Sequence, residues 1–139
     1  MFLAVIQQAL HLKIGQEQEF FGGDRLDGAL VDAIRRLHAD YRTGIISNAL
    51  SDTRRVLVDT WRIVDAFDVI ILSAEVGVMK PEPRIYHLAL QSLSVEPQEA
   101  VFIDDFERNV QGAQNVGLHA IHFRTPQQAL EELSVLRNS

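Results

Sequence analysis

The sequence contains no cysteine, which excludes disulfide bonds, thiolate metal sites and cysteine nucleophiles. Basic residues are also few, with 13 lysines and arginines against 19 aspartates and glutamates and a formal net charge of −6. Non-specific binding to nucleic acid needs a basic surface, so this balance argues against nucleic acid as a partner. We therefore look for chemistry based on hydroxyl, ammonium and carboxylate groups.

Long apolar runs are absent as well, because no segment approaches the roughly 18 apolar residues of a membrane-spanning helix. The apolar stretch Met1–Ala9 has no basic leader, and Gln7 and Gln8 interrupt it. With 139 residues, 47% hydrophobic and 23% charged, the chain has the size and composition of one globular domain. We expect a soluble, cytoplasmic domain with no membrane partner.

Helical stretches alternate with short apolar runs, as in a parallel α/β sheet. The pattern predicts strands over 43–48, 68–73, 100–105 and 118–123. It predicts helices over 1–13, 27–39, 51–61 and 108–116, and a further helix entered through Pro81 and Pro83. Gly117 should end the helix before it, and Thr125 with Gln128 should form the capping box of a last helix.

Polar side chains follow three of the predicted strands, where ligands bind in open α/β sheets. They are Ser47 and Asn48, then Lys80 after a short loop, and then Asp104 with Asp105. A hydroxyl and an ammonium suit a phosphoryl group, and paired carboxylates suit Mg²⁺. A serine at a strand end also serves as a helix cap, and a loop lysine is commonly solvated. The Asp pair is the strongest signal, because adjacent carboxylates repel each other without a cation nearby.

Taken in order, three segments resemble motifs of the haloacid dehalogenase superfamily. Ile45–Ala49 resembles the second motif, Gly77–Tyr86 the third and Val101–Asp105 the fourth. The fourth motif is followed at the family's spacing by Asn109, Gly112, Ala113 and Gly117. The resemblance covers roughly Phe20 to Phe123 and is closest to the phosphatase-like subfamily, which includes the N-terminal phosphatase domain of soluble epoxide hydrolases.

This resemblance implies a Rossmann-like parallel sheet flanked by helices and a Mg²⁺-dependent phosphoric monoester hydrolase acting on a small phosphorylated metabolite. Ser47, Asn48 and Lys80 would bind the phosphoryl group, and Lys80 would also steady the charge of an aspartyl intermediate. Asp105 would bind Mg²⁺ directly. Asp104 would reach the metal through water or pair with Lys80.

The sequence departs from the family at the first motif, an apolar strand ending Asp-x-Asp-x-Thr/Val that supplies the nucleophile. The nearest match, Asp24–Gly28, has the wrong acidic spacing and follows Phe20–Gly23 rather than a strand. Residues 1–22 instead resemble the closing helices of the family's cap. We therefore expect an N-terminally truncated fold, with a cap remnant over 1–22 and a core over 23–139 that lacks its first strand. Without the nucleophile, we expect negligible phosphatase activity.

The missing strand is central in the family, so its neighbours would be left with unpaired edges. Unpaired edges favour chain-to-chain pairing, which predicts a homodimer or a rearranged sheet in which residues 1–6 cover the gap. Two functional alternatives stay open. The chain is part of a longer, working phosphatase, or it is a non-catalytic binding or assembly protein that retains the phosphate and metal pocket.

Overall fold

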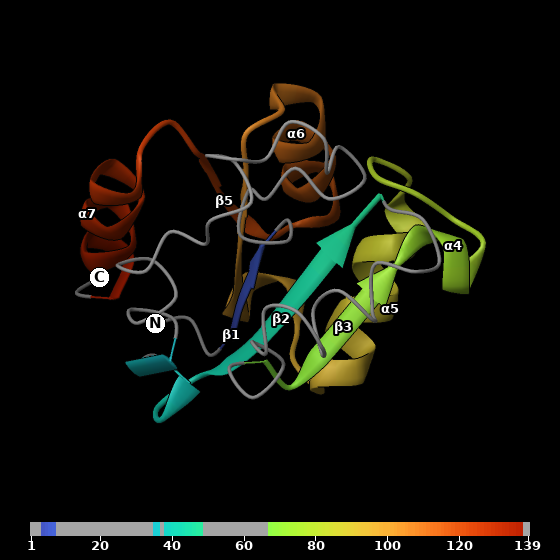
Figure 1. The fold of residues 1–139 in the computed structure, drawn as a ribbon, viewed down its shortest axis with the longest axis horizontal. Helices are drawn as coiled ribbons and strands as arrows, with labels where there is room; N and C mark the ends of the chain where they lie inside the picture. Colours follow the sequence, from blue (N-terminus) through green and yellow to red (C-terminus); the bar gives the residue numbers. More distant parts are fainter. Residues whose placement is uncertain (1–3, 8–34, 37, 49–66, 138–139) are drawn as a thin grey trace, which may run out of the picture.

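The computed structural model describes residues 4–7, 35–36, 38–48 and 67–137. In these segments five parallel strands form one sheet with the order β3-β2-β1-β4-β5 (Figure 1). This order places β1 in the centre, with β2 and β3 on one side and β4 and β5 on the other. The strand order reverses between β1 and β4. Such a reversal is the topological switch point of an open α/β sheet, where ligands commonly bind, and here it lies beside the central strand.

The central strand, β1, consists of Ala4–Gln7. It pairs in parallel with β2 and with β4, and its Ile6 is fully buried. The helix predicted over residues 1–13 is therefore wrong at these four residues, which lie in the sheet rather than in a cap helix. A short apolar run fits a buried strand as well as a helix, and only pairing on both sides decides between them. The rest of the predicted cap remnant lies outside the described residues.

β1 occupies the position between β2 and β4 that we expected to be empty. Of the two outcomes predicted for that gap, the structure shows the rearranged sheet, with residues near the start of the sequence filling it. Within the described segments, β3 and β5 form the two outer edges of the sheet. A homodimer through those edges stays a prediction.

The other four strands lie where the sequence predicts them. They are β2 Arg42–Ser47, β3 Val69–Leu72, β4 Ala100–Asp104 and β5 His119–His122. β2 and β4 are buried almost throughout, as expected for interior strands of a parallel sheet with both faces covered. Their bounds differ from the predicted ones by one residue at most.

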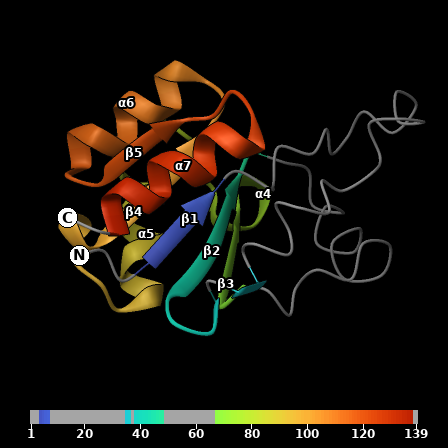
Figure 2. The ribbon, with the colours of Figure 1, turned by 90° about the vertical axis from the view of Figure 1, so that its left-hand side faces the viewer.

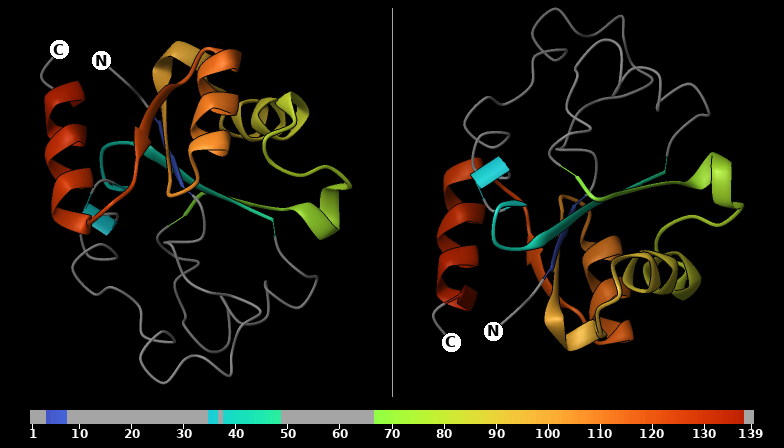
Figure 3. Two further views of the ribbon diagram at one scale, coloured as in Figure 1. Left: turned by 90° about the horizontal axis from the view of Figure 1, so that it is seen from above. Right: turned by 90° about the horizontal axis from the view of Figure 1, so that it is seen from below.

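Helices cover the sheet on two sides (Figures 2 and 3). α5 (Pro83–Leu93) and α6 (Glu107–Val116) pack together on one face, whereas α7 (Pro126–Arg137) packs against β5 from the other side. The short helices α4 (Ser73–Val76) and η5 (Pro97–Glu99) were not predicted. α5 begins just after the Lys80 turn and α6 just after Asp105, so both helices start beside the candidate site.

The predicted helix ends are confirmed. Gly117 ends α6 in the left-handed region, with a φ of 109°, which glycine adopts at little cost. At the start of α7, Gln128 N donates to Thr125 Oγ1 at 3.0 Å, and Thr125 N donates to Gln128 Oε1 at 3.2 Å. These reciprocal bonds are the capping box that the sequence predicts.

Two predicted helices fall largely or wholly outside the described residues. Residues 35, 36 and 38 of the helix predicted over 27–39 are helical, and the helix predicted over 51–61 is not described. Among the helices that the structure describes, none has the length and apolar character needed to cross a membrane.

Candidate active site

The predicted site residues of β2 and β4 lie at the same edge of the sheet. Gln7 of β1 pairs with Ile45 on one side and with Ile103 on the other. Ser47 therefore lies two residues beyond this common level and Asp104 one residue beyond it, both towards the carboxyl ends of the strands. One intervening strand separates them, which corresponds to about 10 Å between the axes of β2 and β4.

A buried ion pair forms the centre of the site. Lys80 Nζ donates to Asp104 Oδ2 at 2.7 Å, and the two side chains are 1% and 0% exposed. Burial lowers the pKa of Lys80 below the ordinary lysine value, while the negative charge of Asp104, and to a lesser degree that of Asp105, opposes this shift. The ammonium also lies 5.6 Å from the centroid of the Phe102 ring.

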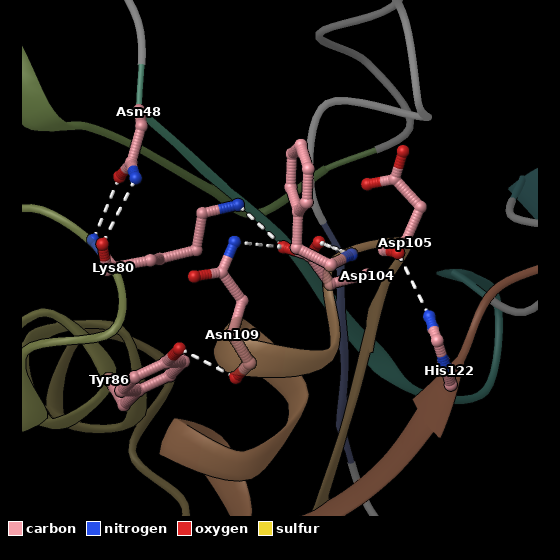
Figure 4. Close-up of polar contacts among 8 residues, drawn as sticks. Asn48, Lys80, Tyr86, Asp104, Asp105, Asn109 and His122 are labelled. Atoms are coloured by element: carbon pink, nitrogen blue, oxygen red, sulfur yellow. Dashed lines mark hydrogen bonds and ion pairs between the residues drawn. The ribbon is translucent and has the colours of Figure 1, made fainter.

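Both carboxylate oxygens of Asp104 are engaged (Figure 4). Oδ1 accepts from the Phe106 backbone N–H at 2.8 Å, and Oδ2 accepts from Asn109 Nδ2 at 3.2 Å as well as from Lys80. Of the two roles predicted for Asp104, the ion pair with Lys80 is therefore confirmed. The Asp104 carboxylate thus accepts three hydrogen bonds in this structure. Metal binding by Asp104 and Asp105 stays a prediction.

Residues of α5 and α6 pack around the Lys80–Asp104 pair. Tyr86 is fully buried, and its hydroxyl donates to the Asn109 carbonyl at 2.8 Å. Burial, with a smaller effect from the charge of Asp104, raises the pKa of Tyr86 above its ordinary value. Its ring meets Phe102 edge to face at 5.3 Å between centroids. Gly112 lies so close to the loop that an added Cβ would be 2.7 Å from Pro81 Cβ.

Sequence reasoning did not single out Tyr86 or Asn109 as site residues, although both lie in the segments that resemble family motifs. The amide oxygen of Asn109 is buried and has no hydrogen-bond partner among the described residues. One sequence feature could have identified Asn109 as a site residue: it lies in the first turn of the helix that follows Asp104. Only the packed structure shows that this turn faces the ion pair.

Ser47 ends β2, on the far side of β1 from Asp104, and Asn48 follows it. Ser47 is 2% exposed, whereas Asn48 is exposed and bonded through its side-chain amide to the main chain of Lys80. The structure thus brings the end of β2 to the Lys80 loop. Phosphate binding by Ser47, Asn48 and Lys80 stays a prediction.

Asp105 is the residue best suited to a direct metal contact. It is exposed, and its carboxylate extends away from the Lys80–Asp104 pair (Figure 4). Its backbone carbonyl lies 2.9 Å from His122 Nε2, a contact between the end of β4 and β5. The described residues contain no group of three or more acidic, histidine or cysteine side chains that could enclose a metal. Mg²⁺ commonly binds through one or two carboxylates, waters and substrate phosphate, so Asp105 fits such an open site.

Comparison with known proteins agrees with this architecture. The sequence model of the haloacid dehalogenase-like hydrolases matches residues 5–117, which is most of the chain. The protein belongs to the haloacid dehalogenase-like hydrolase family. The match includes residues 5–7 of β1 and extends through α6, so it contains all the predicted site residues.

Relatives within this family include phosphatases. The chain is 40% identical over 84 residues to bifunctional epoxide hydrolase 2 of Rattus norvegicus, covering 60% of this chain and 15% of that protein. It is 32% identical over 100 residues to glyceraldehyde 3-phosphate phosphatase of Pyrococcus furiosus, covering 70% of this chain and 41% of that protein. The chain thus spans less than half the length of these curated relatives. The predicted similarity to an epoxide hydrolase and to phosphatases of this family is confirmed.

A solved structure gives the same fold. A haloacid dehalogenase family enzyme of Bacteroides thetaiotaomicron, in complex with magnesium and inorganic phosphate, is 25% identical with a TM-score of 0.66. The alignment covers 71% of this chain and 53% of that enzyme. The predicted α/β fold, a parallel sheet flanked by helices, is therefore confirmed.

Proposed function

We propose that this haloacid dehalogenase-like chain is a phosphoryl-binding domain of the Mg²⁺-dependent phosphatase lineage. The observation that carries the proposal is the buried Lys80–Asp104 pair at the carboxyl edge of the sheet. Burying two charges costs free energy that their mutual attraction often does not recover, so such a pair is poor evidence for stability alone. A lysine fixed by a buried carboxylate beside a switch point is well suited to hold an anion.

In this proposal the phosphoryl group lies between the ends of β2 and β4. The hydroxyl of Ser47 and the ammonium of Lys80 donate to its oxygens, and the second amide hydrogen of Asn48 is available for a further bond. Mg²⁺ would be held by Asp105, water and the phosphate, and when bound it would offset the charge of the phosphoryl oxygens. The phosphatase relatives make a small phosphorylated metabolite the preferred ligand class.

We further propose that these 139 residues bind such a ligand without turning it over. By the family resemblance, the nucleophilic aspartate stands at the end of the strand between β2 and β4. Here that strand is β1, and it ends in Gln7, with Gln8 next in the sequence. A neutral amide does not form the acyl-phosphate intermediate that a carboxylate forms. A binding role is therefore favoured over catalysis for this chain by itself.

Titration of the 139-residue protein with inorganic phosphate, with and without Mg²⁺, tests the binding site. Wild type should bind phosphate saturably when Mg²⁺ is present. Ser47→Ala should weaken phosphate binding about two- to tenfold, the effect of one lost hydrogen bond, and Asp105→Asn should remove the Mg²⁺ dependence. Ser134→Ala and Glu131→Gln make the same chemical changes on the exposed side of α7 and should have no effect.

Two outcomes would overturn the proposal. Absence of saturable phosphate binding in the presence of Mg²⁺ would refute the binding site. Hydrolysis of p-nitrophenyl phosphate by the purified 139-residue protein at more than about 1 s⁻¹ would refute the claim that it does not turn over substrate, because that rate is within the range of ordinary enzymes.

A further inference from the structure

The side-chain amide of Asn48 binds both main-chain groups of Lys80, a residue 32 positions later in the sequence. Lys80 N donates to Asn48 Oδ1 at 2.8 Å, and Asn48 Nδ2 donates to the Lys80 carbonyl at 3.1 Å (Figure 4). The amide thus takes the place of a neighbouring strand and makes the two bonds that such a strand would make. This arrangement fixes the position and the orientation of one peptide segment.

Lys80 needs such a fixed main chain, because it lies in a turn between α4 and α5 rather than in the sheet. The next residue, Pro81, has no N–H with which to anchor the turn. The Lys80 side chain has four rotatable methylene groups, yet its Nζ must meet Asp104 Oδ2 at 2.7 Å in a buried site. Any displacement of the Lys80 main chain would be transmitted to that contact.

The same bonds join two parts of the proposed phosphate site. Asn48 directly follows Ser47 at the end of β2, so the amide ties the position of the Ser47 hydroxyl to that of the Lys80 loop. Asp104 then fixes the far end of the lysine from β4. The spacing between the hydroxyl and the ammonium is therefore set by Asn48 on one side and Asp104 on the other.

We propose that Asn48 is a positioning residue that holds Lys80 in place for anion binding, beyond any direct bond that it makes to the ligand. The ligand part of this proposal rests on the proposed phosphate site. The positioning part does not, because the Lys80–Asp104 contact exists without ligand. The two parts are tested separately.

The first test observes the Lys80 ammonium by ¹⁵N NMR in the ligand-free 139-residue protein. A buried, hydrogen-bonded ammonium exchanges its protons slowly and gives its own signal. Asn48→Ala should accelerate this exchange about tenfold or more, as expected for the loss of two hydrogen bonds. Asn48→Asp retains the acceptor for Lys80 N and should give a smaller change. Asn115→Ala, at an exposed position of α6, should leave the signal unchanged.

Circular dichroism of each variant establishes that it is folded, and Asn48→Asp serves for the comparison if Asn48→Ala does not fold. An unchanged Lys80 signal in a folded Asn48 variant would refute the positioning role. Destabilisation can also accelerate exchange through global opening, so the free energy of unfolding of each variant is measured in urea. An acceleration no larger than the loss of unfolding free energy accounts for would also refute the positioning role.

The second test is a double-mutant cycle on phosphate affinity in Mg²⁺, with Asn48→Ala and Lys80→Gln alone and combined. If Asn48 acts through Lys80, Asn48→Ala weakens binding about tenfold in the wild-type background and less than about twofold in the Lys80→Gln background. If Asn48→Ala weakened phosphate binding by the same factor in both backgrounds, Asn48 would act only through its own contact with the phosphate. That result would overturn the proposal. If wild type binds no phosphate, the proposed function fails, and the ammonium signal alone decides the role of Asn48.

Discussion

The close approach of α6 to the Lys80 loop gives the sharpest prediction for stability. Gly112 lies within α6, and a Cβ added there would be 2.7 Å from Pro81 Cβ, 3.0 Å from the Pro81 carbonyl and 3.0 Å from the Tyr86 hydroxyl. Carbon atoms pack best at about 3.5–4.0 Å, so Gly112→Ala would overlap Pro81 by almost 1 Å. The helix or the loop would have to move.

Two opposing effects set the magnitude of this change. Alanine in a helix interior is favoured over glycine by about 1 kcal/mol. Overpacking a buried contact costs about 1–3 kcal/mol, and loss of the Tyr86–Asn109 hydrogen bond would add about 1 kcal/mol. We therefore expect Gly112→Ala to lower the free energy of unfolding by about 1–3 kcal/mol, despite its better helix propensity.

Urea unfolding followed by circular dichroism measures this difference. Gln111→Ala, at the adjacent exposed position of α6, is the control and should change the free energy of unfolding by no more than about 0.5 kcal/mol. If Gly112→Ala instead stabilised the protein by about 1 kcal/mol, as alanine does at an open helix position, α6 would not pack against Pro81 as described.

Three further predictions concern Lys80, Tyr86 and Ser94. Lys80→Met should destabilise the fold by about 3–5 kcal/mol because it leaves Asp104 buried without a cation, and adding Asp104→Asn should recover part of that loss in urea unfolding. The raised pKa of Tyr86 means that the folded state keeps a proton that the unfolded state loses above pH 10.0, so stability should fall above that pH. This fall, up to about 1.4 kcal/mol per pH unit, should be absent in Tyr86→Phe when unfolding is measured between pH 9 and 11.5. Ser94→Gly should raise the melting temperature by about 2–6 °C, because Ser94 ends α5 with a φ of 58° that glycine adopts more readily; a lower melting temperature would contradict this reasoning.

The sequence alone determined the fold family, four of the strands and five candidate site residues, Ser47, Asn48, Lys80, Asp104 and Asp105. Apolar runs that end in small polar or acidic residues are local signals, and so are Gly117 after α6 and the capping box of Thr125 and Gln128. Their physical basis lies within a few residues of chain, which is why they can be read without the tertiary structure.

Tertiary structure decided what depends on partners far away in the sequence. Ala4–Gln7 is a strand because β2 and β4 pair with it on both sides, although its own pattern also fits a helix. Asp104 is the partner of Lys80 because the folded chain brings an ammonium from 24 residues earlier to its carboxylate. Asn48 meets the Lys80 main chain across 32 residues of sequence. Contacts of this kind form only in the folded sheet. The five candidate site residues could therefore be predicted from the sequence, whereas their contacts, and the presence of Tyr86 and Asn109 beside them, could not.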